Sequence, residues 1–236
     1  MQTFSHFVYT SALALCYSVA EYCSPVWSQS HHCKKLDVAL NECLRLVSGC
    51  IKSTPTDLLP TLSGIQPADI RRDRNILNLR ERALADTHIF HQAITSPLIN
   101  NRLKSRMPLS TRMHHLAGQL QNNTSPDQWA MTTWSNRWHN LRYHLCDYIR
   151  EPSEKPPGYD LKRNHWVLLN RIRSGYGRYA SHMYRIGLSY NPYCVCGEIQ
   201  TPQHVLLCHI IGIKGDISIV DDDFRNWIND NRLLIL

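Results

Sequence analysis

Residues 36–49 have the sequence LDVALNECLRLVSG, and this stretch indicates the fold class most clearly. Its apolar side chains recur every three or four residues, which places them on one face of a helix: Leu36, Leu40, Cys43, Leu44 and Val47. Gly49 follows at a position where helices commonly end in a left-handed residue. The stretch therefore predicts an amphipathic helix that packs one face against the rest of the chain.

Helical patterns of the same kind occupy most of the chain. The apolar run at 10–22 predicts a helix buried on most sides, and Pro67 opens a charged helix that we expect to end near Ser96. Further helical patterns lie at 54–63, 129–148, 166–172 and 179–186. No long run alternates apolar and polar residues, which is the pattern of a half-buried strand. The sequence therefore predicts a mainly α fold.

Proline, glycine and charge divide the chain into segments. Residues 151–158 have the sequence EPSEKPPG, which is typical of a linker, and residues 97–128 carry few periodic apolar side chains. We therefore expect four consecutive segments. These are a helical domain at 1–95, a connector with a Trp-rich helix and a Pro-rich linker at 96–158, a module of basic helices and a zinc knuckle at 159–212, and an amphipathic tail at 213–236.

The cysteines do not indicate a disulfide framework. The chain has nine, an odd number, and six lie in apolar helical stretches: Cys16, Cys23, Cys33, Cys43, Cys50 and Cys146. With 236 residues the chain is long enough for a core of its own, so we expect these six to be buried thiols. No Lys or Arg precedes the apolar run at the amino end, and that run is too short to cross a bilayer. We expect a cytoplasmic or nuclear protein that is neither secreted nor membrane-bound.

The positive charge is concentrated in one part of the chain. The net charge is +7, and residues 161–193 hold six basic residues and no acidic one. Arginine forks suit phosphates and tyrosine rings stack on unpaired bases, which gives six candidate nucleic-acid contacts: Arg171, Arg173, Arg178, Arg185, Tyr176 and Tyr179. The alternative is a solvated helix face whose tyrosines lie in the core. The charge predicts a polyanionic partner.

A short cysteine and histidine pattern follows this basic stretch. Cys194 and Cys196 form a Cys-x-Cys pair before Gly197; seven residues separate this pair from His204, and three residues separate His204 from Cys208. Three thiolates and one imidazole match a closed, structural zinc site with no open position for catalysis. Thr201 and Pro202 are expected to begin a helix that carries His204 and Cys208 on one face. The alternative is a chance grouping in a chain with nine cysteines and thirteen histidines.

No catalytic residue is assigned. Nucleotidyl transfer needs paired carboxylates to hold two metal ions, and the one acidic run, at 221–223, precedes an expected helix whose dipole such charges complement. The sequence contains neither a glycine-rich phosphate loop nor a Gly-x-Ser-x-Gly elbow.

Several short motifs occur in order along the chain. In the first part they lie at 17–22, 25–27, 36–41, 45–49, 54–55 and 64–67. In the last part they lie at 169–175, 187–188 and 194–197, followed by Gln200, Thr201, His204 and Cys208. The first group resembles the region downstream of the polymerase palm in non-LTR (LINE-type) retrotransposon reverse transcriptases. The second resembles the carboxyl-terminal knuckle region of the jockey and CR1-like branches of that family.

This resemblance implies a fold and a role. Residues 1–95 would be a helical thumb-like bundle, which in the family lies along the template–primer duplex. The family's aromatic-x-Asp-Asp palm motif is absent, and sixteen residues precede the first matching segment. The resemblance thus implies a nucleic-acid-binding fragment of a transposable-element RNA-directed DNA polymerase, without its active site. Its partner would be RNA or an RNA/DNA template–primer, with structural zinc as the cofactor and no small-molecule substrate.

Two other roles remain open at this stage. The chain is the carboxyl-terminal part of an active reverse transcriptase if a palm encoded upstream is missing from the gene model. It is an adaptor if the zinc knuckle binds protein instead of nucleic acid. Salt dependence separates the adaptor from the nucleic-acid binder, because phosphate contacts weaken steeply as salt rises.

Overall fold

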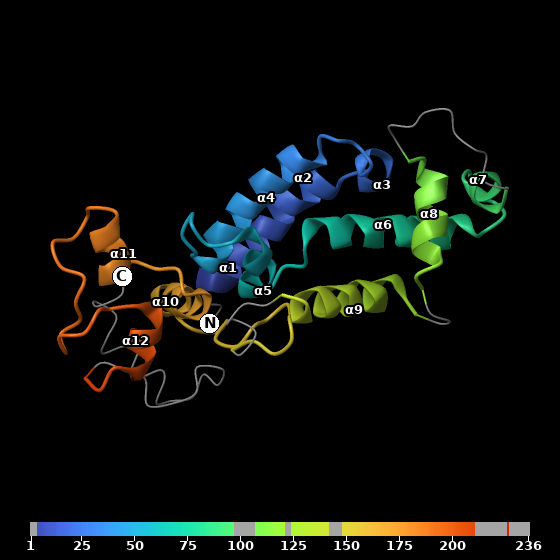
Figure 1. Cartoon of the computed structure of the whole chain (residues 1–236). Helices are drawn as coiled ribbons and strands as arrows, with labels where there is room; N and C mark the ends of the chain where they lie inside the picture. The colour runs from blue at the N-terminus through green and yellow to red at the C-terminus, as the bar shows by residue number, and fades with distance from the viewer. Residues whose placement is uncertain (1–3, 97–106, 121–123, 142–147, 211–225, 227–236) are drawn as a thin grey trace. The chain divides into compact units, whose positions relative to one another are not determined.

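The structure is a computed structural model, and it describes residues 4–96, 107–120, 124–141, 148–210 and 226 (Figure 1). This part of the chain is mainly α-helical, as the sequence predicts. Its β-structure amounts to a single antiparallel bridge between Tyr193 and Ile199. None of the described helices is both long and apolar enough to span a membrane. The tail expected at 213–236 lies outside the described residues apart from Asn226, and so does Cys146.

The chain folds into two compact units that do not follow the four expected segments. Unit 1 combines residues 1–12, 41–65 and 141–236, and unit 2 combines 13–40 and 66–140. The expected domain at 1–95 is therefore divided between them. The reason is long-range packing inside each unit, which residue order along the chain does not reveal.

Unit 2 is organised around α6 (Ala68–Ala83). This helix packs against α3 (Ser24–Trp27), α8 (Leu109–Ala117) and α9 (Pro126–His139), and Figure 1 shows α6 and α9 running side by side. A capping box begins α9, because Ser125 and Gln128 each accept a hydrogen bond from the other's backbone N–H. The three tryptophans of α9 are buried, as their spacing predicts: Trp129, Trp134 and Trp138.

The arginines that crowd α6 and its neighbours are used inside unit 2. Burying a charge costs free energy unless it is paired, and five of these arginines each meet a carboxylate. The pairs are Arg71–Glu21, Arg72–Asp37, Arg74–Asp127, Arg112–Asp73 and Arg137–Asp69. Burial acts to lower the pKa of Arg72, but the hydrogen bonds and charge of Asp37 hold that pKa above its ordinary value. These arginines therefore connect helices.

Two helical expectations need correction. The charged helix that opens at Pro67 ends at Ala83, and a separate helix, α7, covers His91–Thr95. Turns at 84–90 divide them, where Asp86 and Thr87 are residues that compete with helical backbone hydrogen bonds.

The apolar run near the amino end also differs from expectation. It forms α1 (Phe4–Ser11), a π-helical segment (Ala12–Tyr17) and α2 (Ser18–Glu21). Leu15, Val19 and Tyr22 are at least 70% exposed, so the run is not buried on most sides. An apolar run cannot reveal which of its faces the rest of the chain will cover. For the same reason Cys16 and Cys23 are exposed and Cys33 and Cys43 half-buried, whereas Cys50 is buried as expected.

Unit 1 is built on α10 (Arg163–Ser174), which packs against the carboxyl end of α4 (Cys33–Ser48). The last carbonyls of a helix have no hydrogen-bond donor within that helix. Side chains of α10 supply donors to the carbonyls at the end of α4. Trp166 donates to the Val47 carbonyl at 3.2 Å, Asn170 to that of Ser48 at 2.9 Å, and Arg171 to that of Gly49 at 3.3 Å. A second face of α10 enters an apolar core made of Leu161, Trp166, Leu168, Leu169, Ile172, Tyr179, Cys194, Val205 and Cys208.

The segment expected to be an open linker is packed in unit 1. Pro152, Pro156 and Gly158 are buried, and Arg173 donates to the Pro157 carbonyl at 2.7 Å. Gly64, which ends α5 (Leu59–Ser63) with φ +74°, lies so close to the Glu154 carbonyl that an added Cβ would overlap it.

Gly64→Ala should therefore destabilise the protein by at least about 2 kcal/mol, since positive φ and backbone overlap both penalise a side chain. Urea unfolding measures this. Gly118→Ala is the matched control, because its φ is −65° and its nearest neighbours would lie 3.6 Å from the new Cβ. Equal stability of the two variants would contradict the packing of the 151–158 segment.

Candidate metal centre and nucleic-acid interface

The Cys-x-Cys pair lies on a tight hairpin. Gly197 adopts φ +92°, a conformation that favours glycine, and its N–H donates to the Cys194 carbonyl at 2.9 Å. The Cys194 N–H in turn donates to the Glu198 carbonyl at 2.7 Å, and the bridge between Tyr193 and Ile199 closes the hairpin. The backbone therefore fixes both thiols on one short turn.

The other two side chains of the pattern come from α12 (Pro202–Leu207) and the residue after it. The predicted cap is confirmed, because the Thr201 hydroxyl accepts a hydrogen bond from the His204 N–H at 3.0 Å. Cys208 is not on the helical face expected for it. The helix ends at Leu207, and Cys208 is extended, with ψ 130°. A helix of six residues spans under two turns, and this one ends before Cys208. Cys208 therefore joins the cluster from the extended segment that follows the helix.

The four side chains converge on one point. The Sγ atoms of Cys194, Cys196 and Cys208 and a ring nitrogen of His204 all lie within 4.8 Å of one another. The Cys194 and Cys208 sulfurs are 3.9 Å apart, and Cys196 Sγ is 3.1 Å from His204 Nε2. Zn–S bonds of 2.3 Å in a tetrahedron place two sulfurs about 3.8 Å apart. This cluster, hereafter the Cys₃His cluster, could hold a metal ion.

The imidazole is oriented by a carboxylate. His204 Nδ1 lies 3.2 Å from the Glu198 carboxylate, while Nε2 points at the Cys196 sulfur. Metal-binding histidines usually donate their second ring N–H to such an acceptor, which fixes the ring and the tautomer. The sequence pattern did not single out Glu198, although its place between Gly197 and His204 is the signal that would have found it. His209 is exposed and outside the cluster.

Two of the six predicted nucleic-acid contacts are buried. Arg173 is 1% exposed, and burial lowers its pKa to about 9. Tyr179 is 2% exposed, its hydroxyl donates to the Arg171 carbonyl at 3.0 Å, and burial raises its pKa. Both side chains belong to the interior of unit 1, although Tyr179 also lines the pocket described below.

The other four predicted contacts are at least partly exposed to solvent. Arg171 is half-buried, and burial followed by the charge of Arg178 lowers its pKa. Arg178 and Arg185 are exposed, and Tyr176 is partly exposed.

The sequence-based set missed two further exposed tyrosines. Tyr190 is fully exposed and Tyr193 is 54% exposed on the hairpin side of the cluster. The position of Tyr193 directly before Cys194 is the signal that could have identified it.

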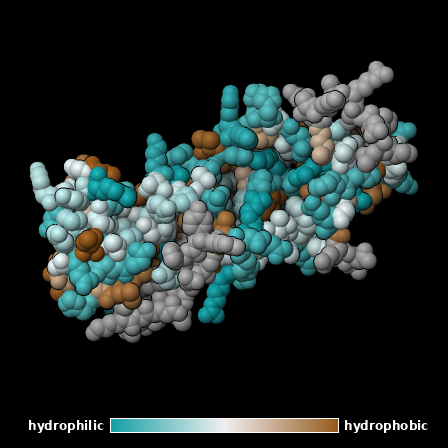
Figure 2. All heavy atoms as spheres, in the orientation of Figure 1, coloured by the Kyte–Doolittle hydropathy of each residue, from teal (hydrophilic) through white to brown (hydrophobic). Residues whose placement is uncertain are grey.

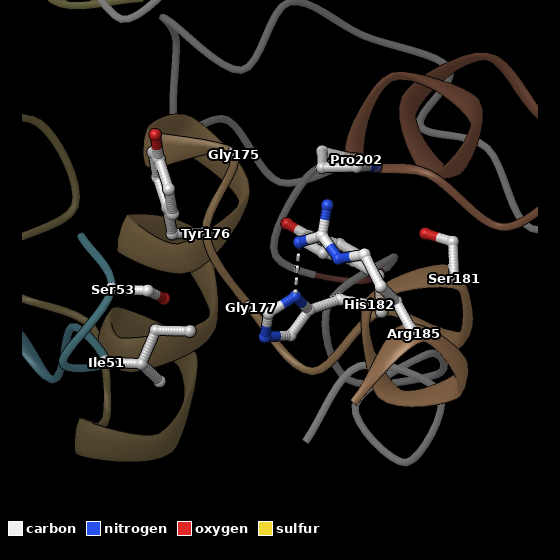
Figure 3. Close-up of a pocket in the computed structure, with 10 residues that line it drawn as sticks. Ile51, Ser53, Gly175, Tyr176, Gly177, Ser181, His182, Arg185 and Pro202 are labelled. Carbon is white, nitrogen blue, oxygen red and sulfur yellow. Dashed lines mark hydrogen bonds between the residues drawn. The ribbon is translucent and has the colours of Figure 1, made fainter. Parts of the chain in front are cut away.

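A pocket lies beside the Cys₃His cluster, within unit 1. Its volume is about 430 Å³. Figure 3 shows Tyr176, Ile51 and Ser53 on one side of it and His182 and Arg185 on the other. An Arg185 guanidinium nitrogen lies 3.0 Å from His182 Nδ1, and no acidic residue is among the described residues that line the pocket.

Comparisons of the chain with protein-family models, with curated proteins and with solved structures found no match in any of the three. The chemistry of the cluster, the exposed tyrosines and the pocket is therefore what bears on function.

Proposed function

We propose that residues 176–210, hereafter the knuckle module, bind zinc and use it to present a surface for single-stranded RNA. The observation that carries this proposal is the convergence of three thiols and one imidazole within 4.8 Å, beside a stretch without acidic residues. Soft thiolates in a closed four-ligand set favour zinc over magnesium or calcium. With every position filled by protein, the ion stabilises the fold and does not activate water.

The surface of the knuckle module suits unpaired nucleotides. Tyr184, Tyr190 and Tyr193 are each more than half exposed, and Arg178 and Arg185 are exposed among them. Figure 2 shows apolar side chains on this part of the surface, among hydrophilic ones. Exposed aromatic rings stack on bases that are not already stacked in a duplex, and arginines neutralise phosphates. Together these features favour a single strand over a double helix.

We also propose that the chain acts in the cytoplasm or nucleus as the nucleic-acid-binding part of a non-LTR retrotransposon reverse transcriptase, and that it binds without polymerising. The order of the sequence motifs supports the family. Two-metal nucleotidyl transfer needs carboxylates that are free to bind metal. In unit 2 four carboxylates that face α6 or project from it are paired with arginines, which supports a structural role for these four: Glu21, Asp37, Asp69 and Asp73.

A protein-binding adaptor is the second candidate. It is favoured by aliphatic side chains at the surface of the knuckle module, where Leu188 is 70% and Leu207 85% exposed. Its partner would be apolar, and its affinity would change little with salt.

Titration of the full-length chain with a fluorescent single-stranded RNA tests the proposal. The logarithm of the affinity should fall linearly with the logarithm of salt concentration, with a slope of about −0.7 per phosphate neutralised. Arg178→Ala with Arg185→Ala should flatten that slope by about one to two units, whatever the RNA sequence. The full chain is required, because a 159–212 fragment would lose the α4 and α5 carbonyls on which α10 packs.

Arg80→Ala with Arg82→Ala, at the end of α6 in unit 2, is the matched control and should leave the slope unchanged. Salt-insensitive binding, or none, would overturn the proposal, and salt-insensitive binding to a protein partner would support the adaptor.

A further inference from the structure

We propose that the pocket beside the Cys₃His cluster holds a single nucleotide of the bound strand, with the phosphate at Arg185 and His182 and the base against Tyr176. This inference rests on the proposed function and deepens it. It assigns a specific site for one nucleotide on the surface that we propose binds single-stranded RNA.

The size and walls of the pocket fit a small ligand. Its volume of about 430 Å³ is in the range of small-molecule sites, which run from roughly 300 to 1,000 Å³. Its walls come from residues 51–53 after α4, the turn after α10, α11 (Ala180–Arg185), and Pro202 at the start of α12. Segments distant in sequence therefore build one concave site.

The polar side of the pocket is suited to a phosphate. Arg185 and His182 lie together there, 3.0 Å apart between nitrogens, and both face the space shown in Figure 3. An arginine fork with an adjacent imidazole offers several N–H donors to the oxygens of one phosphate. Since none of the described lining residues is acidic, nothing in the pocket repels that charge.

The opposite side of the pocket is suited to a base. Tyr176 stands there with Ile51 below it, and its ring is partly exposed. Gly175 ends α10 with φ +70°, and Gly177 leaves room for Tyr179, whose ring would lie 3.0 Å from an added Cβ. The two glycines thus allow the turn to keep Tyr179 in the core while Tyr176 faces the pocket. A ring in this position stacks on any base, so we expect little base specificity.

The pocket is connected to the Cys₃His cluster through Gln200. This buried side chain accepts a hydrogen bond from the Ala180 N–H at 2.8 Å, and the backbone carbonyl of Gln200 accepts one from the Ser181 hydroxyl at 2.7 Å. Gln200 also donates its backbone N–H to the Pro192 carbonyl, just before the Cys-x-Cys hairpin. The hairpin that carries two of the metal-binding thiols therefore positions the helix that carries His182 and Arg185.

Binding of adenosine 5′-monophosphate to the zinc-loaded, full-length protein, followed by ligand-observed NMR, tests the inference. The monophosphate should bind, and adenosine or inorganic phosphate alone should each bind at least about tenfold more weakly, because each lacks one half of the contacts. Tyr176→Leu and Arg185→Ala should each weaken the monophosphate about tenfold. The matched controls Tyr22→Leu and Arg82→Ala, exposed residues of unit 2, should not.

The possible outcomes separate the pocket assignment from the proposed function. If RNA binds with the expected salt slope but the monophosphate does not bind, or the pocket variants behave like the controls, the pocket assignment is wrong and the proposed function stands. If the monophosphate binds but RNA does not, the ligand is a free nucleotide and both claims fail as stated. Circular dichroism checks the folding of each variant. Should Tyr176→Leu unfold, the exposed Arg185→Ala alone decides.

Discussion

Replacing Cys196 with Ser should remove most of the bound zinc and unfold the knuckle module. The purified protein should carry about one zinc ion per chain, because the Cys₃His cluster supplies one closed set of ligands. The free energy of binding at such a site is also folding free energy, so losing a ligand releases the metal and loosens the chain around it. Cys194 and Cys208 pack in the same core as Trp166 and Val205, so the damage should spread to the rest of unit 1.

Metal analysis of dialysed protein measures this directly. Cys196→Ser and His204→Ala should each lower the zinc content towards zero, whereas Cys16→Ser, an exposed cysteine of unit 2, should keep it. Full zinc content in a protein that carries both Cys194→Ser and Cys208→Ser would show that the ion sits elsewhere.

Helix positions could be predicted where a local pattern decides them. The spacing of Leu40, Leu44 and Val47 predicted α4, and all three side chains are buried in the structure. Thr201 and Pro202 predicted the start of α12, because a cap depends on residues only three positions apart. The Cys₃His cluster was predictable for a similar reason, since a hairpin, one short helix and the residue after that helix bring its four side chains together.

Burial and partners could not be predicted where distant segments decide them. Leu15 and Val19 are exposed because no described segment covers that face of an apolar run. The sequence showed that α6 is charged, but it did not show that Glu21 and Asp37 would pair with Arg71 and Arg72 of this helix. The burial of Arg173, by contrast, could have been predicted from the sequence. Its spacing from Trp166 and Leu169 places it on the buried face of α10, a signal that the sequence contained but that counting charges overlooked.

Zinc removal should cost RNA affinity as well as structure. Without the ion the Cys-x-Cys hairpin should lose the metal bonds that join it to His204 and Cys208, and Gln200 should then hold the start of α11 less firmly. Arg185 and the exposed Tyr193 would then lose their fixed positions. Losing two or more such contacts should weaken binding roughly a hundredfold.

The most direct test of the account is therefore a titration of single-stranded RNA into zinc-loaded protein, into protein stripped by a chelator, and into stripped protein that has been given zinc again. All three are measured at one salt concentration. We expect tight, weak and restored binding in that order, with zinc content measured on each sample. Equal affinity in all three samples, with the stripped one proven metal-free, would contradict it.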